Sequence, residues 1–109
     1  MIEQRKSQRF QLRLPLRILR SGSTTLSGAG ETLNVGSRGV LFTANQRLEI
    51  GASIEYAITL PPAPGSSDGS GLRCLGKVLR YEGSTEVPDS RAKQYVMAAT
   101  IERHEFLRQ

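Results

Sequence analysis

Apolar and polar residues alternate over several short segments of the chain. The clearest alternation runs over Leu12–Ile18, and it returns over Ser53–Leu60 and Tyr95–Ile101. A period of two is typical of a half-buried β-strand, because successive side chains of a strand point to opposite faces. Each of these three segments is therefore predicted to be a strand with one face on a core.

Weaker strand signals and polar loops fill most of the remaining chain. Glu31–Val35, Val40–Phe42 and Leu72–Tyr81 carry strand-forming residues without clean alternation. Stretches rich in Gly, Ser, Pro and other small or polar residues separate the segments, over 21–30, 61–71 and 84–93. Short strands joined by Gly-rich turns predict an all-β domain built as a small antiparallel barrel. Only Ile101–Gln109 has the character of a helix, and that helix would be short.

Two residues inside predicted strands indicate local irregularity. Pro15 has no backbone N–H to donate to a sheet, which favours an edge or a partly unpaired position. Gly76 lies within Leu72–Tyr81 and indicates a β-bulge or the close approach of another backbone.

Composition limits the class of protein. A chain of 109 residues suits one domain. No apolar run approaches the roughly 18 residues of a membrane span, and no apolar segment follows the basic N-terminus as it would in a secretory signal. A lone cysteine, Cys74, excludes an intrachain disulfide. We therefore expect a cytoplasmic protein without a membrane span.

Charge is unevenly distributed. The net charge is +5, and the first twenty residues hold six basic residues and one acidic residue, whereas the remaining 89 residues balance. Residues 1–10 have no apolar face to bury, so they are predicted to be a flexible basic arm. Charge confined to one arm favours a local anionic target over a long nucleic-acid groove.

Four arginines, Arg5, Arg9, Arg13 and Arg17, recur at a spacing of four residues. A helix through them would cross Pro15, which costs a helix interior about 3 kcal/mol. Arg13 and Arg17 are therefore predicted to point outward from a strand. Arg5 and Arg9 precede that strand, and their guanidinium groups can pair with phosphate, bind a guanine edge or stack on a base.

A second candidate element is the sequence NVGSRG, Asn34–Gly39. Gly36 and Gly39 allow a sharp turn whose amides face a ligand. Asn34 carries both a donor and an acceptor and can read a base edge. Taken alone, this sequence is equally typical of an ordinary turn between two strands.

In combination these elements resemble the PilZ domain family, bacterial receptor modules for cyclic di-GMP. The family pattern is Arg-x-x-x-Arg and a strand, followed at a distance by Asp/Asn-x-Ser-x-x-Gly. Here RKSQR, Arg5–Arg9, precedes FQLRLPLRI, and NVGSRG precedes VLF. The segments GKVLRYE and QYVMAATIE are similar to later strands of the family, so the resemblance covers nearly the whole chain.

The resemblance implies a six-stranded antiparallel split barrel with a short C-terminal helix, in a single domain over residues 1–109. It also implies that Arg5 and Arg9 hold the phosphates and guanine faces of cyclic di-GMP, that Asn34 reads a guanine edge and that Gly39 makes the turn. A nucleotide that orders the arm would change the surface offered to a downstream protein partner. No cofactor beyond this ligand, no metal and no nucleic acid are implied.

The chain departs from the family pattern at two positions. Gly36 stands where the family has serine, and a hydrogen bond to a charged acceptor is typically worth about 1.5–3 kcal/mol. Ser37 is a neighbouring hydroxyl, although adjacent strand side chains point to opposite faces. Gln4 stands where the family often has a further arginine, which is compatible with one bound nucleotide or with a stacked pair.

Other functions stay open on the sequence. A PilZ-like module that has lost nucleotide binding and acts through protein contacts is one alternative. A small barrel that binds single-stranded nucleic acid is another, but Tyr56 and Tyr95 fall on apolar strand faces, where they are expected in the core instead of as stacking platforms. Catalysis has the least support, because His104 is expected at the surface and Cys74 in the core. Arg38 and Arg80 are additional candidates for ligand contacts.

Overall fold

The computed structural model describes residues 9–62, 64–65, 70–86 and 93–108, all of which are strand, turn or irregular structure. The strands are β1 (Arg9–Phe10), β2 (Pro15–Ser21), β3 (Thr24–Gly36), β4 (Gly39–Ala44), β5 (Ser53–Leu60), β6 (Ser70–Glu86), β7 (Lys93–Thr100) and β8 (Arg103–Arg108).

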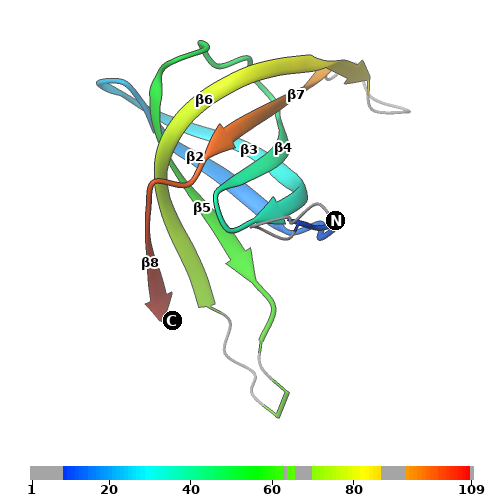
Figure 1. Ribbon diagram of the computed structural model, residues 1–109, viewed down its shortest axis with the longest axis vertical. Helices are drawn as coiled ribbons and strands as arrows, with labels where there is room; N and C mark the ends of the chain where they lie inside the picture. The colour runs from blue at the N-terminus through cyan, green and yellow to red at the C-terminus, as the bar shows by residue number, and fades with distance from the viewer. Residues whose placement is uncertain (1–8, 63, 66–69, 87–92, 109) are drawn as a thin grey trace, which may run out of the picture.

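Six strands close into an antiparallel barrel, as predicted. Their order is β3-β2-β5-β6-β7-β4, and β4 pairs back with β3 to complete the circle (Figure 1). Each of the six segments predicted from the sequence contributes to one of the strands β2–β7. β1 extends the sheet beside β3. β8 pairs with the first part of β6, Ser70–Leu75, and β7 pairs with the second part.

The core fills the barrel with the inward residues of the alternating segments. Leu16 and Ile18 of β2 and the β5 residues Ile54, Tyr56 and Ile58 are all buried, in line with the predicted period of two. Phe42 stacks on Tyr56 with ring centroids 6.2 Å apart. Tyr95 packs at the margin of the core, as expected.

The hairpin between β2 and β3 occupies a stretch predicted to be an irregular loop. Gly22, with φ of 61°, and Ser23 form its turn, and the first half of β3 then runs through residues that are small or polar except for Leu26. Small residues are required there because strands approach closely: a Cβ on Gly30 would lie 1.7 Å from the carbonyl oxygen of Thr43. The small residues that indicated a loop in the sequence instead allow two strands to pack closely.

The prediction of a short C-terminal helix over Ile101–Gln109 is wrong. Residues Arg103–Arg108 form β8, which pairs antiparallel with β6 from Leu75↔Arg103 to Ser70↔Arg108. β7 pairs with β6 only from Val78 onward. The same edge of β6 over Ser70–Leu75 therefore has backbone N–H and C=O groups that need other partners. A helix of nine residues would have been marginal in water, whereas β8 satisfies that edge.

The two predicted irregularities have physical counterparts. β2 lies between β3 and β5, but Pro15 pairs only with Glu31 of β3, and the pairing with β5 begins at Leu16. At Gly76 a Cβ would lie 1.8 Å from the carbonyl oxygen of Thr100, so the backbone of β7 passes directly over this glycine. Pro15 is thus partly unpaired, and Gly76 marks a close backbone approach.

Candidate functional site

The predicted second element forms the turn between β3 and β4. Val35 pairs with Val40, so Gly36–Gly39 are the four residues between them. Ser37 and Arg38 are exposed. Gly39 is needed for space: a Cβ there would lie 2.9 Å from the carbonyl oxygen of Ala99 on β7. The Arg38 carbonyl accepts a hydrogen bond of 2.8 Å from the Ile101 N–H, which fixes the turn against the end of β7.

The predicted first element lies beside this turn. Strand β1 pairs antiparallel with the end of β3, in the register Arg9↔Gly36 and Phe10↔Val35. The backbone of Arg9 is therefore directly opposite Gly36. Arg5 lies outside the described residues, as does most of the arm predicted to be flexible.

A buried threonine holds the backbone between β1 and β2. Thr32 is fully buried, and its Oγ1 accepts a hydrogen bond of 2.9 Å from the Leu14 N–H and donates one to the Leu12 carbonyl. The Thr32 N–H donates to the Leu14 carbonyl at 2.9 Å. These bonds replace regular strand pairing and position the chain that leads to Arg9.

Asn34 lies on β3, one residue beyond a β-bulge. The register passes from Thr32↔Phe42 to Asn34↔Leu41, which leaves Leu33 without an opposing residue. Such a bulge changes which way the following side chains point. Asn34 is half-buried two residues before Gly36, on the strand that β1 joins.

A hollow of about 220 Å³ adjoins the turn. Its lining includes Arg38 and Gly39 from the turn and Leu79 and Arg80 from β6. A shift in the β6–β7 register at Leu79 leaves this side chain half-exposed at the hollow. Arg80 forms an ion pair with the neighbouring Glu82. The structure therefore places Arg38 and Arg80 together at one side of the predicted site.

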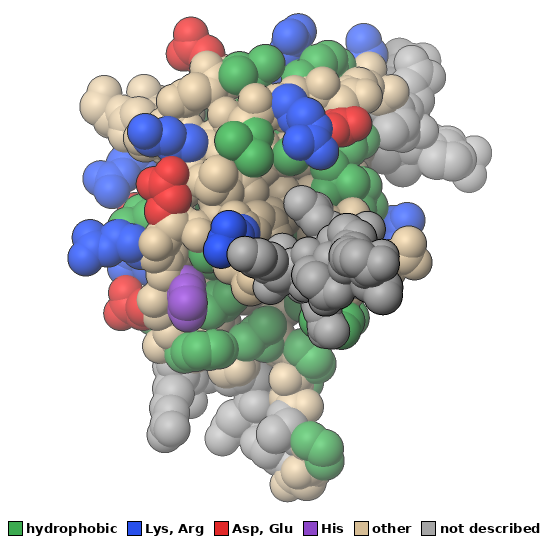
Figure 2. All heavy atoms as spheres, in the orientation of Figure 1, with side chains coloured by type: hydrophobic (Ala, Val, Ile, Leu, Met, Phe, Trp, Pro, Cys, Tyr) green, Lys and Arg blue, Asp and Glu red, His purple; other side chains and the backbone are tan. Residues whose placement is uncertain are grey.

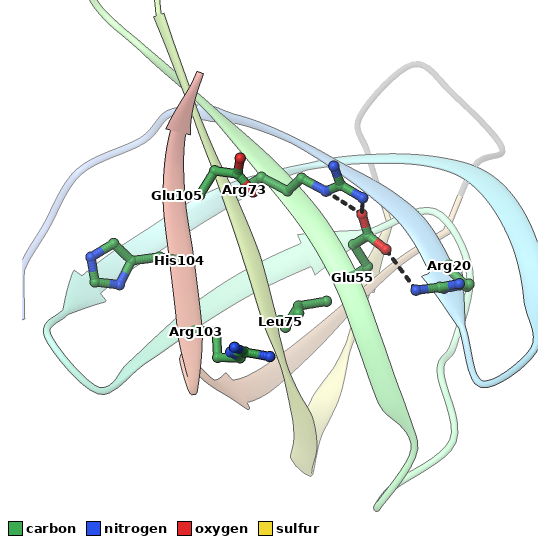
Figure 3. Close-up of a pocket in the computed structure, with 7 residues that line it drawn as sticks. All are labelled: Arg20, Glu55, Arg73, Leu75, Arg103, His104 and Glu105. Atoms are coloured by element: carbon green, nitrogen blue, oxygen red, sulfur yellow. Dashed lines mark hydrogen bonds and ion pairs between the residues drawn. The ribbon is translucent and has the colours of Figure 1, made fainter. Parts of the chain in front are cut away.

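A second charged cluster, which no sequence pattern predicted, lies on the outer face of the barrel. Glu55 on β5 is only 5% exposed, although it points away from the core. Its carboxylate accepts a hydrogen bond of 2.9 Å from Arg20 and pairs on its other oxygen with Arg73. In Figure 3 the two guanidinium groups approach Glu55 from different strands. The only sequence signal was a glutamate inside an alternating strand.

Cys74 and His104 lie on opposing strands but in different environments. Cys74 is fully buried, and desolvation raises the pKa of its thiol to about 11. His104 is exposed, as expected, but on β8 instead of a helix. Among the residues that the structure describes, no group of three or more His, Cys, Asp and Glu is arranged to hold a metal ion.

Comparison with known proteins gives no match. No protein-family model, no curated protein and no solved structure matches the chain. Within the described residues there is no helix with the length and apolar character needed to cross a membrane.

Proposed function

We propose that this chain is a cytoplasmic cyclic di-GMP receptor module of the PilZ type. The observation that carries the proposal is the backbone register of β1, in which Arg9 stands opposite Gly36. Two sequence elements more than twenty residues apart are thereby neighbours, which is what a shared nucleotide site requires. The exposed turn residues and the hollow beside Arg38 and Arg80 offer further donors to an anion.

In the proposed mechanism, cyclic di-GMP binds between the arginine arm and the turn. Arg5 and Arg9 pair with phosphate oxygens and guanine, while Asn34 binds a guanine edge. Binding orders the arm on the barrel, and the new surface is recognised by a protein partner. No step of this mechanism is catalytic.

The test is calorimetry of the full chain with cyclic di-GMP, with GMP and GTP as controls for specificity. Arg5→Ala and Arg9→Ala should each weaken binding by about tenfold or more, the equivalent of a charge-assisted hydrogen bond. Arg13→Ala is the matched control, because this exposed arginine pairs with Glu31 instead of bordering the turn. Unchanged affinity in both arm variants would refute the proposal.

The alternative is a module of the same fold that acts through protein contacts alone, and Gly36 favours it. A glycine at this position offers no hydroxyl to a phosphate. Gly36→Ser tests the difference: if the nucleotide occupies this turn, the added hydroxyl should tighten binding by about tenfold. If neither the natural chain nor Gly36→Ser binds cyclic di-GMP in calorimetry, the interaction module is the better description.

A further inference from the structure

The outer face of the sheet β2-β5-β6-β8 carries two rows of aligned side chains. Residues directly opposite each other on neighbouring strands share a face. One row is Arg17↔Ala57↔Arg73↔Glu105, and the next is Arg20↔Glu55↔Leu75↔Arg103. Four arginines thus share this face with two glutamates, for a formal net charge of +2.

A hollow of about 470 Å³ lies over these rows. Arg20, Arg73 and Arg103 border it together with Glu55, Glu105 and Leu75. This volume is within the range of small-molecule sites, about 300–1,000 Å³. His104 also borders the hollow, but Figure 3 shows its imidazole on the other side of β8 from Arg103.

Glu55 organises two of the arginines without exhausting their donors. Each guanidinium has five N–H groups, and Glu55 engages only those that face it. The side chains of Arg20 and Arg73 are 52% and 47% exposed, whereas that of Glu55 is 6% exposed. The buried carboxylate therefore acts as a support beneath two oriented guanidiniums whose outer donors are available.

Figure 3 shows Arg103 on the other side of Leu75 from Glu55. Arg103 forms no ion pair with any described residue. Strand β8, which carries Arg103, is one strand spacing from β6 with Arg73 and three from β2 with Arg20, or about 5 Å and 14 Å between backbones. Exposed guanidiniums on this scale suit a ligand with more than one charged oxygen group. In Figure 2, Lys and Arg side chains are frequent along the left-hand edge of the molecule, with Asp and Glu among them.

From this geometry we infer that the hollow over Glu55 and Leu75 is a second anion site, which binds the phosphoryl groups of a small phosphorylated ligand. Phosphoryl groups offer several terminal oxygens to planar, bidentate guanidinium donors. A single-stranded nucleic acid does not fit, because neither row contains an aromatic side chain on which bases stack. The inference is independent of the proposed function, which concerns the turn at Gly36–Gly39.

The test is a titration of the ¹⁵N-labelled full chain with pyrophosphate, followed by amide chemical shifts at constant ionic strength. Saturable shifts are expected at Glu55, Leu75 and Arg103. Arg103→Ala should weaken binding by about tenfold, because it removes charge-assisted hydrogen bonds while leaving the pairs of Glu55 intact. Arg13→Ala is the control of equal charge change and should leave the affinity unaltered.

Two outcomes would overturn the inference. The first is evidence of general charge attraction. It would show either as amide shifts that never saturate or as an equal loss of affinity in Arg103→Ala and Arg13→Ala. The second is a hexaglutamate peptide that moves the same amides at lower concentration than pyrophosphate, since the face would then bind an acidic protein segment. If Arg103→Ala does not fold, Arg103→Lys replaces it and should weaken binding by about threefold, because it loses the bidentate fork. The turn amides report separately on the cyclic di-GMP site.

Discussion

Thr32 and Glu55 are the buried polar residues on which the two candidate sites depend. Thr32 bonds the backbone at Leu12 and Leu14, and Glu55 holds two guanidiniums in place. A buried polar group without partners costs about 1–3 kcal/mol, so these partners are held in fixed positions. Thr32 thereby positions the chain that leads to β1, and Glu55 shapes the outer hollow.

Cys74 gives the fold a defined sensitivity to alkali. Burial raises the pKa of its thiol from 9.0 to about 11. The unfolded chain therefore loses this proton first as pH rises, and the free energy of unfolding falls between pH 9 and pH 11 by about 1.4 kcal/mol per pH unit at most. Below pH 9 the contribution is complete. Tyr56, whose pKa burial also raises, acts in the same direction at higher pH.

The measurement is urea unfolding at pH 8, 9 and 10. The midpoint should fall between pH 9 and 10, and the fall should be smaller in Cys74→Ala, which has no thiol to titrate. The natural chain and Cys74→Ala would show the same pH dependence if the thiol were not buried in the folded state.

At the scale of elements, the strands that could be predicted are those whose alternation reflects a buried face. β5 is the clearest case, because Ile54, Tyr56 and Ile58 all enter the core. The first half of β3 was not predictable, since the steric reason for a small residue, as at Gly30 beside Thr43 of β4, is visible only once the register is known. β8 was missed for a related reason: it exists because β6 has an open edge, and its own side chains are mostly exposed.

The candidate sites differ in the same way. Arg9 and Gly36 belong to recognisable motifs, so the sequence could suggest that they share a site. The hollow over Glu55 depends on the alignment of residues across four strands, and no spacing along the chain encodes that alignment.

Glycines on β6 allow a test of how closely its neighbours approach. At Gly76 an added Cβ would meet the Thr100 carbonyl oxygen at 1.8 Å, whereas at Gly71 the nearest atom would be 3.7 Å away. Gly76→Ala should therefore lower the free energy of unfolding by about 3 kcal/mol or more, because backbone must move to relieve the overlap.

Gly71→Ala lies on the same strand and is the matched control, expected to change stability by less than about 0.5 kcal/mol. Thermal or urea unfolding measures both. Equal stability of the two variants would show that β7 does not cross β6 at Gly76.

For the whole molecule, the closed barrel and the peripheral β8 strand should differ in stability. Every barrel strand pairs with at least two other strands, whereas β8 pairs with β6 alone among the described strands. Its hydrogen bonds can therefore open locally while the barrel stays folded. Amide hydrogen exchange over residues 104–107 should be at least about tenfold faster than at Val78 and Met97, which are in the barrel core. Equal rates with equal denaturant dependence would mean that β8 unfolds only with the barrel.

This difference links the stability of β8 to the inferred anion site. Arg103 is carried on β8, while Arg20, Glu55 and Arg73 are carried on the other strands of the sheet, so local opening of β8 dismantles the hollow. A ligand that binds only the closed arrangement must lower the population of the open one. Pyrophosphate should accordingly slow exchange in β8 while leaving the β7 amides of the barrel unaffected. Slower exchange in both strands alike would instead indicate a general stabilisation of the fold.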